Sequence, residues 1–152
     1  MATNESLERL LRYTINQNVK ILPFEKGMKK VKIMKTRNVI VMNTAPEFIK
    51  QGHFIVIIKH SKNEIIIFDP LASEYTDLLL QPLFKNFNTL FINKKQIQSN
   101  ESEFCSLFCA SFLIAFYNHK NIDDYFNQFS RNLKLNDMYV IKYLFNELEN
   151  IT

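Results

Sequence analysis

A run of apolar residues from Leu107 to Phe116 is the strongest feature of the hydrophobic pattern. These residues cover every angle of a helix, which predicts a helix buried on all sides. The polar run 93–102 precedes it, and Cys105 lies where polar gives way to apolar. Ser102 is the expected N-cap, with its hydroxyl accepting from the backbone N–H of Cys105. A thiol in the first turn of a helix is biased toward the thiolate, which is the nucleophilic form.

The clearest hairpin follows the pattern HFIVIIKH, then SKNE, then IIIFDP. Both limbs are nearly continuous in apolar residues, as in strands buried on both faces. His53 begins the first strand, and Asp69 ends the second before Pro70. The start of one antiparallel limb lies beside the end of the other, so we expect His53 and Asp69 to meet at one edge of the sheet.

The rest of the chain predicts helices before and after this sheet. The amphipathic pattern of residues 4–17 predicts a helix. A loop with one or two strands is expected over residues 21–42, and a connector over residues 45–52. Residues 71–85 predict a loop and short helix, and 89–92 another strand. Residues 125–148 predict one or two helices, whose expected inward side chains are Phe126, Phe129, Met138, Ile141, Leu144 and Phe145. We therefore expect one α+β domain over residues 1–152, a mixed central sheet flanked by helices.

Composition narrows the class of protein. The chain has 152 residues, of which 47% are hydrophobic, and this indicates a globular fold with a real core. No long apolar run or leader pattern is evident, so we expect no membrane association. Two cysteines four residues apart predict neither a disulfide framework nor a zinc site, but a free thiol in a reducing compartment.

The net charge of +4 favours an anionic partner such as DNA. Much of this charge comes from one short stretch that contains Lys26, Lys29, Lys30, Lys32, Lys35 and Arg37. The same residues would also suit an ordinary solvated basic face.

His53, Asp69 and Cys105 together match the requirements of acyl transfer by cysteine, a thiol beside a base that a third group orients. The backbone N–H of Cys105 would supply one oxyanion donor, and the side chain of Gln98 or Gln96 the other. Taken singly, each signal has a simpler interpretation, as a core histidine, a turn aspartate or a small core cysteine. Cys109, amid apolar neighbours, is interpreted as core packing.

The order His, Asp, Gln, Cys excludes a papain-like arrangement. The segments VMNTAPEFIKQGHFIVIIKHSKNEIIIFDPLASEY and QSNESEFCSLFCASFLIAFYNH resemble the adenovirus maturation protease family, with relatives in virophages and Maverick-type elements. The resemblance implies an adenain-like cysteine protease fold, with the nucleophile on a buried helix. It assigns Cys105 as nucleophile, His53 as general base and acid, Asp69 as orienting carboxylate, and Gln98 as oxyanion donor.

The family cuts viral precursor proteins during capsid maturation, so the resemblance implies such substrates and a place in the virion interior, the host nucleus or a cytoplasmic virus factory. It implies a monomer without cofactor or metal, open to stimulation by DNA or by a peptide. No cysteine stands in 89–95, where the adenovirus peptide would attach through a disulfide, so we expect no such attachment. Two residues depart from the family pattern, Ser106 where Gly is usual and Phe54 where Trp is usual.

Two alternatives remain open. One keeps the fold and triad but hydrolyses ubiquitin-like modifiers, as other members of the clan do. The other is an inactive descendant that serves as a DNA-binding or capsid-associated structural protein, an interpretation that Ser106 keeps open.

Overall fold

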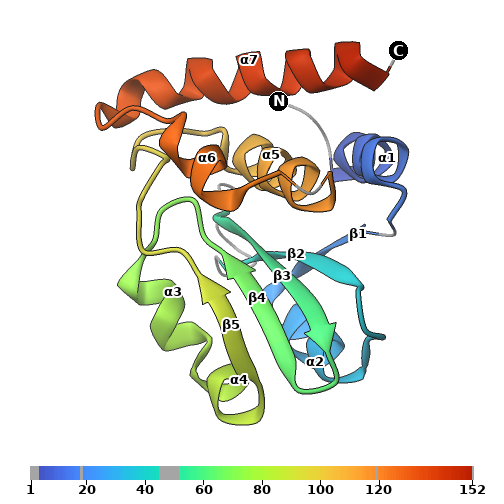
Figure 1. Ribbon diagram of the computed structural model, residues 1–152. Helices are drawn as coiled ribbons and strands as arrows, with labels where there is room; N and C mark the ends of the chain where they lie inside the picture. The colour runs from blue at the N-terminus through green and yellow to red at the C-terminus, as the bar shows by residue number, and fades with distance from the viewer. Residues whose placement is uncertain (1–3, 18, 45–51, 119, 152) are drawn as a thin grey trace.

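The computed structural model describes residues 4–17, 19–44, 52–118 and 120–151, and its elements follow the chain as labelled in Figure 1. The strands are β1 (Val19–Pro23), β2 (Val39–Asn43), β3 (Phe54–Ser61), β4 (Glu64–Phe68) and β5 (Asn88–Ile92). The helices are α1 (Asn4–Ile15), α2 (Phe24–Ile33), α3 (Glu74–Leu79), α4 (Gln81–Asn86), α5 (Cys105–Tyr117), α6 (Ile122–Asn127) and α7 (Asn136–Ile151), with a 3-10 turn at Leu133–Leu135 before α7.

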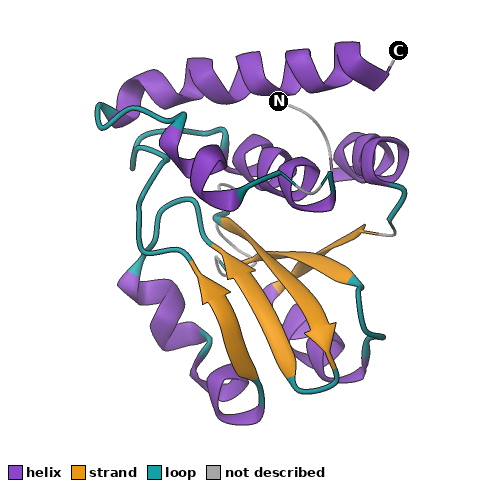
Figure 2. Cartoon of the chain, viewed as in Figure 1, coloured by secondary structure: helices purple, strands orange, loops and turns teal. Residues whose placement is uncertain are grey.

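The five strands form one mixed sheet in the order β1-β2-β3-β4-β5. The inner pairs β2–β3 and β3–β4 are antiparallel, while the outer pairs β1–β2 and β4–β5 are parallel. The hairpin of β3 and β4 is therefore at the centre, as its apolar limbs predicted. The sheet with helices on both faces is the α+β architecture expected from the sequence (Figure 2).

Successive side chains of the central strands point to opposite faces of the sheet and form part of two hydrophobic cores. One face, through Val39, Val41, Val56, Ile58, Ile66 and Phe68, shares a core with α1, α5 and α6, and α7 joins this core from the far side of α5. The opposite face packs against α2 and α4 through Ile40, Met42, Ile55, Ile57, Ile65 and Ile67. Because side chains point alternately to the two faces of a strand, β-branched residues at consecutive positions fill both cores at once.

Helix α5 is buried as its all-round apolar pattern predicted, with nine of its residues, from Cys105 to Ala115, in the core. The Phe112 ring stacks on Phe68 of β4, with centroids 4.3 Å apart and planes 2° from parallel. Figure 1 shows α5 between the sheet and α7, so α7 forms an outer layer over it. The first turn of α5 is thereby fixed against the end of the sheet.

The basic stretch, expected to be a loop, is mostly helix α2. Tertiary contacts stabilise it. Gly27 lets the helix lie close to the sheet, since a Cβ there would meet Met42 Sδ at 2.6 Å. At its other end, Lys59 Nζ donates to the carbonyls of Val31 and Lys32 at 3.1 and 3.3 Å.

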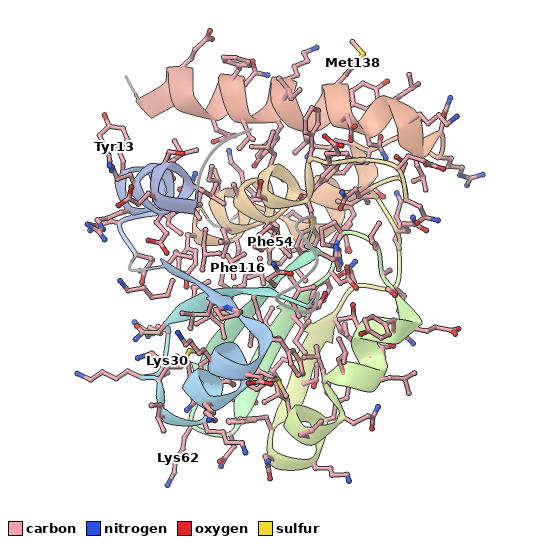
Figure 3. All side chains as sticks on the ribbon, turned by 180° about the vertical axis from the view of Figure 1, so that it is seen from behind. Tyr13, Lys30, Phe54, Lys62, Phe116 and Met138 are labelled. Atoms are coloured by element: carbon pink, nitrogen blue, oxygen red, sulfur yellow. The ribbon has the colours of Figure 1, made fainter. Side chains whose placement is uncertain are left out.

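Two residues of α7 expected to point inward lie on its outer side. Met138 is 70% exposed and Phe145 62%, and Figure 3 shows Met138 pointing away from the rest of the molecule. Phe126, Phe129 and Leu144 are buried as expected. The prediction was wrong at the two positions because α7 is an outer helix that packs on α5 with one side only.

No helix in the described ranges has the length and apolar character needed to cross a bilayer. The same residues contain no group of three or more side chains arranged to hold a metal ion.

Candidate active site

The hairpin brings His53 and Asp69 together at one edge of the sheet. His53 immediately precedes β3 and Asp69 immediately follows β4. The His53 Nε2 atom lies 2.5 Å from Asp69 Oδ1, and the two side chains are 19% and 2% exposed. The predicted contact between them is therefore present, as an ion pair when the imidazole carries two protons.

The other nitrogen of the same imidazole faces Cys105. His53 Nδ1 lies 3.2 Å from Cys105 Sγ, at the first residue of α5. The imidazole therefore lies between the thiol and the carboxylate, with one ring nitrogen for each. This is the geometry that nucleophilic catalysis by a cysteine requires.

The main chain of Phe54 contacts the same thiol. Its N–H donates to Cys105 Sγ at 3.1 Å, and its carbonyl lies 3.0 Å from Sγ. As a thiol, Cys105 can donate to this carbonyl; as a thiolate, it can accept the N–H. Since these groups belong to the backbone of β3, the aromatic side chain at position 54 is not needed for them.

Cys109 contributes more than the packing expected of it. It is fully buried, but its thiol donates to the Phe54 carbonyl at 3.3 Å, the same oxygen that Cys105 contacts. The two thiols therefore lie side by side, one turn apart on α5. Burial raises the pKa of the Cys109 thiol well above its ordinary value, which keeps it protonated and able to donate.

Charge separation is favoured between the thiol and the imidazole. Burial acts to raise the pKa of Cys105. The hydrogen bonds from Cys109 and His53 and the charge of His53 act in the opposite direction and are stronger, so the pKa of Cys105 falls to about 6. Burial lowers the pKa of His53, but the hydrogen bonds to Asp69 and Cys105 and their charges raise it to about 10. At neutral pH the pair is therefore a thiolate and an imidazolium.

Asp69 remains ionised because it is saturated with donors. Burial acts to raise its pKa, and the hydrogen bond and charge of His53 lower it below its ordinary value. The backbone N–H of Leu71 donates to Oδ1 at 2.9 Å, and that of Ser73 to Oδ2 at 3.0 Å. The turn that starts at Pro70 thus wraps around the carboxylate and aims it at the imidazole.

Asn93, which sequence reasoning missed, fixes the backbone of Asp69. It follows β5, and its side chain accepts from the Asp69 N–H at 2.9 Å and donates to the Asp69 carbonyl at 2.6 Å. The amide thereby continues the ladder between β4 and β5 beyond the last paired residues. The sequence held one hint, a polar residue directly after the predicted strand 89–92.

Gln98 and Gln96 differ in how many amide hydrogens they have free. Gln98 is 2% exposed and donates to the Ser102 carbonyl at 3.0 Å, the one acceptor that its amide contacts. Gln96 donates to the Gln98 carbonyl at 2.8 Å and to Asn100 Oδ1 at 3.0 Å, which uses both its hydrogens. Of these two glutamines, Gln98 therefore keeps one amide hydrogen unused, and its Oε1 is buried without a hydrogen-bond partner, in the loop that leads into α5.

Ser102 does not cap α5, contrary to expectation. The helix begins at Cys105, with Phe104 as N-cap and no side-chain cap. The Ser102 hydroxyl accepts from the Phe104 N–H at 3.1 Å and donates to Asp137 Oδ1 at 2.6 Å. The helix begins two residues later than the capping pattern assumed, and Ser102 connects the turn before it to α7.

The predicted basic residues lie elsewhere. Lys26, Lys29, Lys30 and Lys32 are exposed on α2, and Lys35 and Arg37 are exposed in the turn that follows it. Helix α2 covers the sheet face opposite α5. These residues therefore form a surface separate from the thiol and imidazole.

No protein-family model and no curated protein sequence matches the chain. Among solved structures, it is similar to the crystal structure of the selenomethionine form of the ASFV pS273R protease, with a TM-score of 0.50 and 14% sequence identity. The alignment covers 92% of this chain and 66% of that one, so this chain spans just under two thirds of the protease. The likeness confirms the fold, an α+β architecture that this chain shares with a viral protease.

Proposed function

We propose that this protein is a viral cysteine endopeptidase that cleaves capsid or core precursor proteins during virion maturation. The proposal depends on two contacts of the His53 imidazole. Its Nδ1 lies 3.2 Å from Cys105 Sγ, and its Nε2 lies 2.5 Å from Asp69 Oδ1. The shared fold with a viral protease supports the assignment to this class.

In the proposed reaction, the Cys105 thiolate attacks the scissile carbonyl carbon, and a carbon–sulfur bond forms as the carbonyl oxygen becomes an oxyanion. The intermediate collapses when the carbon–nitrogen bond breaks and the proton on His53 Nδ1 passes to the leaving amine. Water then attacks the thioester and gives a proton to the same nitrogen, and the carbon–sulfur bond breaks to restore the thiolate. Asp69 orients the ring and stabilises its positive charge throughout.

The oxyanion would be held by the backbone N–H of Cys105 and the free amide hydrogen of Gln98. Gln98→Ala should therefore lower turnover by about a hundredfold or more, the usual effect of losing one oxyanion donor. Gln96→Ala is the matched control, and its turnover should stay near that of the wild type because both its amide hydrogens are already used. Turnover of purified variants on one substrate decides between them, and a larger loss in Gln96→Ala would contradict the assignment.

The wider setting belongs to the same proposal. The enzyme works as a monomeric single domain without metal or cofactor, in the virion interior and in the host nucleus or a cytoplasmic virus factory. Its partners are viral precursor proteins. DNA bound through the basic residues of the segment 26–37, or an activating peptide, stimulates it. Exposed lysines gathered on α2 support the DNA part of the proposal.

The experiment that tests the proposal is labelling with a thiol-directed electrophile at neutral pH, followed by mapping of the modified cysteine. We expect selective labelling of Cys105 in the wild type and its loss in His53→Ala. Cys109 is the internal control, because its thiol remains protonated and fully buried. Slow and equal labelling of both cysteines would instead support the inactive structural protein, which binds DNA or the capsid.

A second experiment separates the endopeptidase from the alternative hydrolase. Unmodified wild-type protein should cleave capsid precursors and leave a ubiquitin-like probe that ends in Gly-Gly intact. Cleavage of the probe alone would assign the protein to the modifier hydrolases of the clan. In either case Cys105→Ala and His53→Ala should abolish turnover, and Asp69→Asn should reduce it less, because Asp69 acts through the histidine.

A further inference from the structure

A cleft lies at the opposite end of α5 and β3 from Cys105 and His53. It has a volume of about 740 Å³, and its walls come from the end of α1, the turn before β2, the end of β3 and the end of α5. The two ends of α5 are separated by roughly 18 Å, given a rise of 1.5 Å per residue. This cleft, which we call the distal cleft, is therefore separate from the reacting groups.

The distal cleft combines an apolar floor with a cationic rim. Its apolar side chains are Ile15, Ile58, Phe116, Tyr117 and Ile122, and its polar ones are Gln17, Arg37, His60 and Lys120. Arg37, His60 and Lys120 are all exposed at the rim. No Asp or Glu lines the described part of the cleft, and within the described residues neither Arg37 nor Lys120 forms an ion pair.

The backbone of Arg37 is held in an unusual conformation. Its φ of 72° lies in the left-handed region, which non-glycine residues seldom adopt. Its N–H donates to the Lys59 carbonyl at 2.6 Å, and its carbonyl accepts from Tyr117 Oη at 3.2 Å. The surrounding structure thus fixes the backbone from which the Arg37 side chain extends, and backbone strain of this kind often accompanies binding sites.

We propose that the distal cleft binds an acidic peptide segment of a partner protein. One apolar side chain of the segment packs on Phe116 and Tyr117, and its carboxylates contact Arg37 and Lys120. Aromatic residues and arginine are the side chains most enriched at the centres of protein interfaces. A nucleic acid fits less well, because two cations at one rim cannot follow a phosphate backbone and much of the floor is aliphatic.

The test uses Cys105→Ala protein, so that peptide hydrolysis cannot interfere and the result does not depend on the proposed protease activity. The probes are an array of hexapeptides that carry two Asp or Glu residues and one Phe, Leu or Ile at every relative spacing. Matched arrays replace the acids by Lys or the apolar residue by Ser, and a dT oligonucleotide serves as the nucleic-acid probe. Fluorescence anisotropy gives the affinity of each probe.

We expect binding by acidic peptides that contain an apolar residue and none by either matched array. Adding Arg37→Gln and Lys120→Gln should weaken binding by about tenfold or more, as the loss of charged hydrogen bonds predicts. Adding Lys85→Gln and Lys134→Gln, which change the net charge equally outside the cleft, should have no such effect. Circular dichroism of both double variants verifies folding.

The proposal is overturned if no acidic peptide binds, or if binding survives loss of Arg37 and Lys120. It is also overturned if the oligonucleotide, and not the peptides, depends on these two residues. A protein that binds acidic peptides at the distal cleft without labelling at Cys105 would retain this inference while losing the protease assignment.

Discussion

The main chain of Phe54 links the two thiols of the candidate active site. Its N–H and carbonyl contact Cys105 Sγ at 3.1 and 3.0 Å, and the carbonyl also accepts from Cys109. The donor that stabilises a thiolate, the Phe54 N–H, is thus built into a strand and does not depend on a particular side chain at position 54. Replacement of the Trp usual in the resembling family by Phe54 leaves this part of the site intact.

The reactivity of Cys105 should follow the two pKa values of the ion pair. Alkylation by a neutral electrophile should rise as the pH increases through about 6, because the thiolate forms there. Turnover should fall again above about 10, where the His53 imidazolium that protonates the leaving amine loses its proton. Stopped-flow alkylation against pH gives the first midpoint. In His53→Ala the midpoint of alkylation should rise toward 9.0, the ordinary pKa of a cysteine thiol. A wild-type midpoint near 9 would contradict the ion pair.

Cys109 should tune the nucleophile. Its S–H, which can donate to the Phe54 carbonyl, can instead donate to the Cys105 thiolate and lower the pKa of Cys105. Cys109→Ala should therefore raise that pKa and slow alkylation at pH 6 by about threefold, a small effect because a thiol is a weak donor. Cys109→Ser is the matched control, since a hydroxyl still donates and fits the space. Equal midpoints for Cys109→Ala and the wild type would show that Cys109 only fills the core.

At the scale of elements, a single lysine of the central strand caps the basic helix. Lys59 is 6% exposed, its Nζ donates to the carbonyls of Val31 and Lys32, and it lies 5.4 Å from the centre of the Phe87 ring. A cation at the C-terminal end of a helix is favourable both as a hydrogen-bond donor and through the helix dipole. Lys59 therefore joins α2 to the sheet.

Lys59→Met should lower the free energy of unfolding by about 1–3 kcal/mol, because two carbonyls at the end of α2 lose a charged partner while the apolar stem is retained. Urea denaturation followed by circular dichroism measures this loss. Lys62→Met, at the exposed hairpin turn, is the control and should unfold at nearly the wild-type midpoint (Figure 3). Equal midpoints for the two variants would show that the cap is not needed.

The elements that the sequence predicted are those with strong local patterns. The β3–β4 hairpin follows from two β-branched runs around a short turn, and α5 from an apolar run too long for one strand. Helix α2 was missed because Gly27 lies inside it, and because the contacts that stabilise it come from Met42 and Lys59 on other elements.

In the candidate site, too, the contacts between neighbouring strands of a hairpin could be predicted from the local pattern, and those between distant elements could not. The meeting of His53 and Asp69 follows from hairpin pairing alone. The placement of Cys105 beside them was expected from the needs of cysteine acyl transfer and from the family resemblance, since its position at the start of a helix does not say what that helix packs against. Asn93 could not be found in this way. Its amide bonds with Asp69 depend on the parallel pairing of β4 and β5, which lie 19 residues apart in the chain and have no local signature.

At the scale of the molecule, α5 and β3 each connect two regions for which we propose a function. One end of each carries the ion pair of Cys105 and His53, and the other end lines the distal cleft. Both elements are buried in the same core, so the two regions are joined by rigid structure and not by a linker. The lysines of α2 form a third region on the other sheet face, where a bound polyanion would leave both the thiol and the distal cleft open.

This separation leads to a prediction about DNA. If α2 supplies about four phosphate contacts, affinity for duplex DNA should fall roughly a hundredfold between 50 and 200 mM salt, because each contact releases counterions. Lys29→Gln with Lys32→Gln should reduce the slope of log affinity against log salt by about 2, one unit per lost contact. Fluorescence anisotropy with a labelled duplex measures both quantities.

The control for this prediction is Lys85→Gln with Lys134→Gln, which lowers the net charge by the same amount away from α2 and should leave the slope nearly unchanged. Equal reductions in the two double variants would mean that DNA responds to overall charge alone. An affinity that does not fall with salt would remove the electrostatic basis for DNA binding altogether.

Because α2 and Cys105 lie on opposite faces of the sheet, none of these lysine substitutions should alter alkylation of Cys105 without DNA. Loss of the salt slope with unchanged alkylation would therefore separate the polyanion surface from the thiol experimentally.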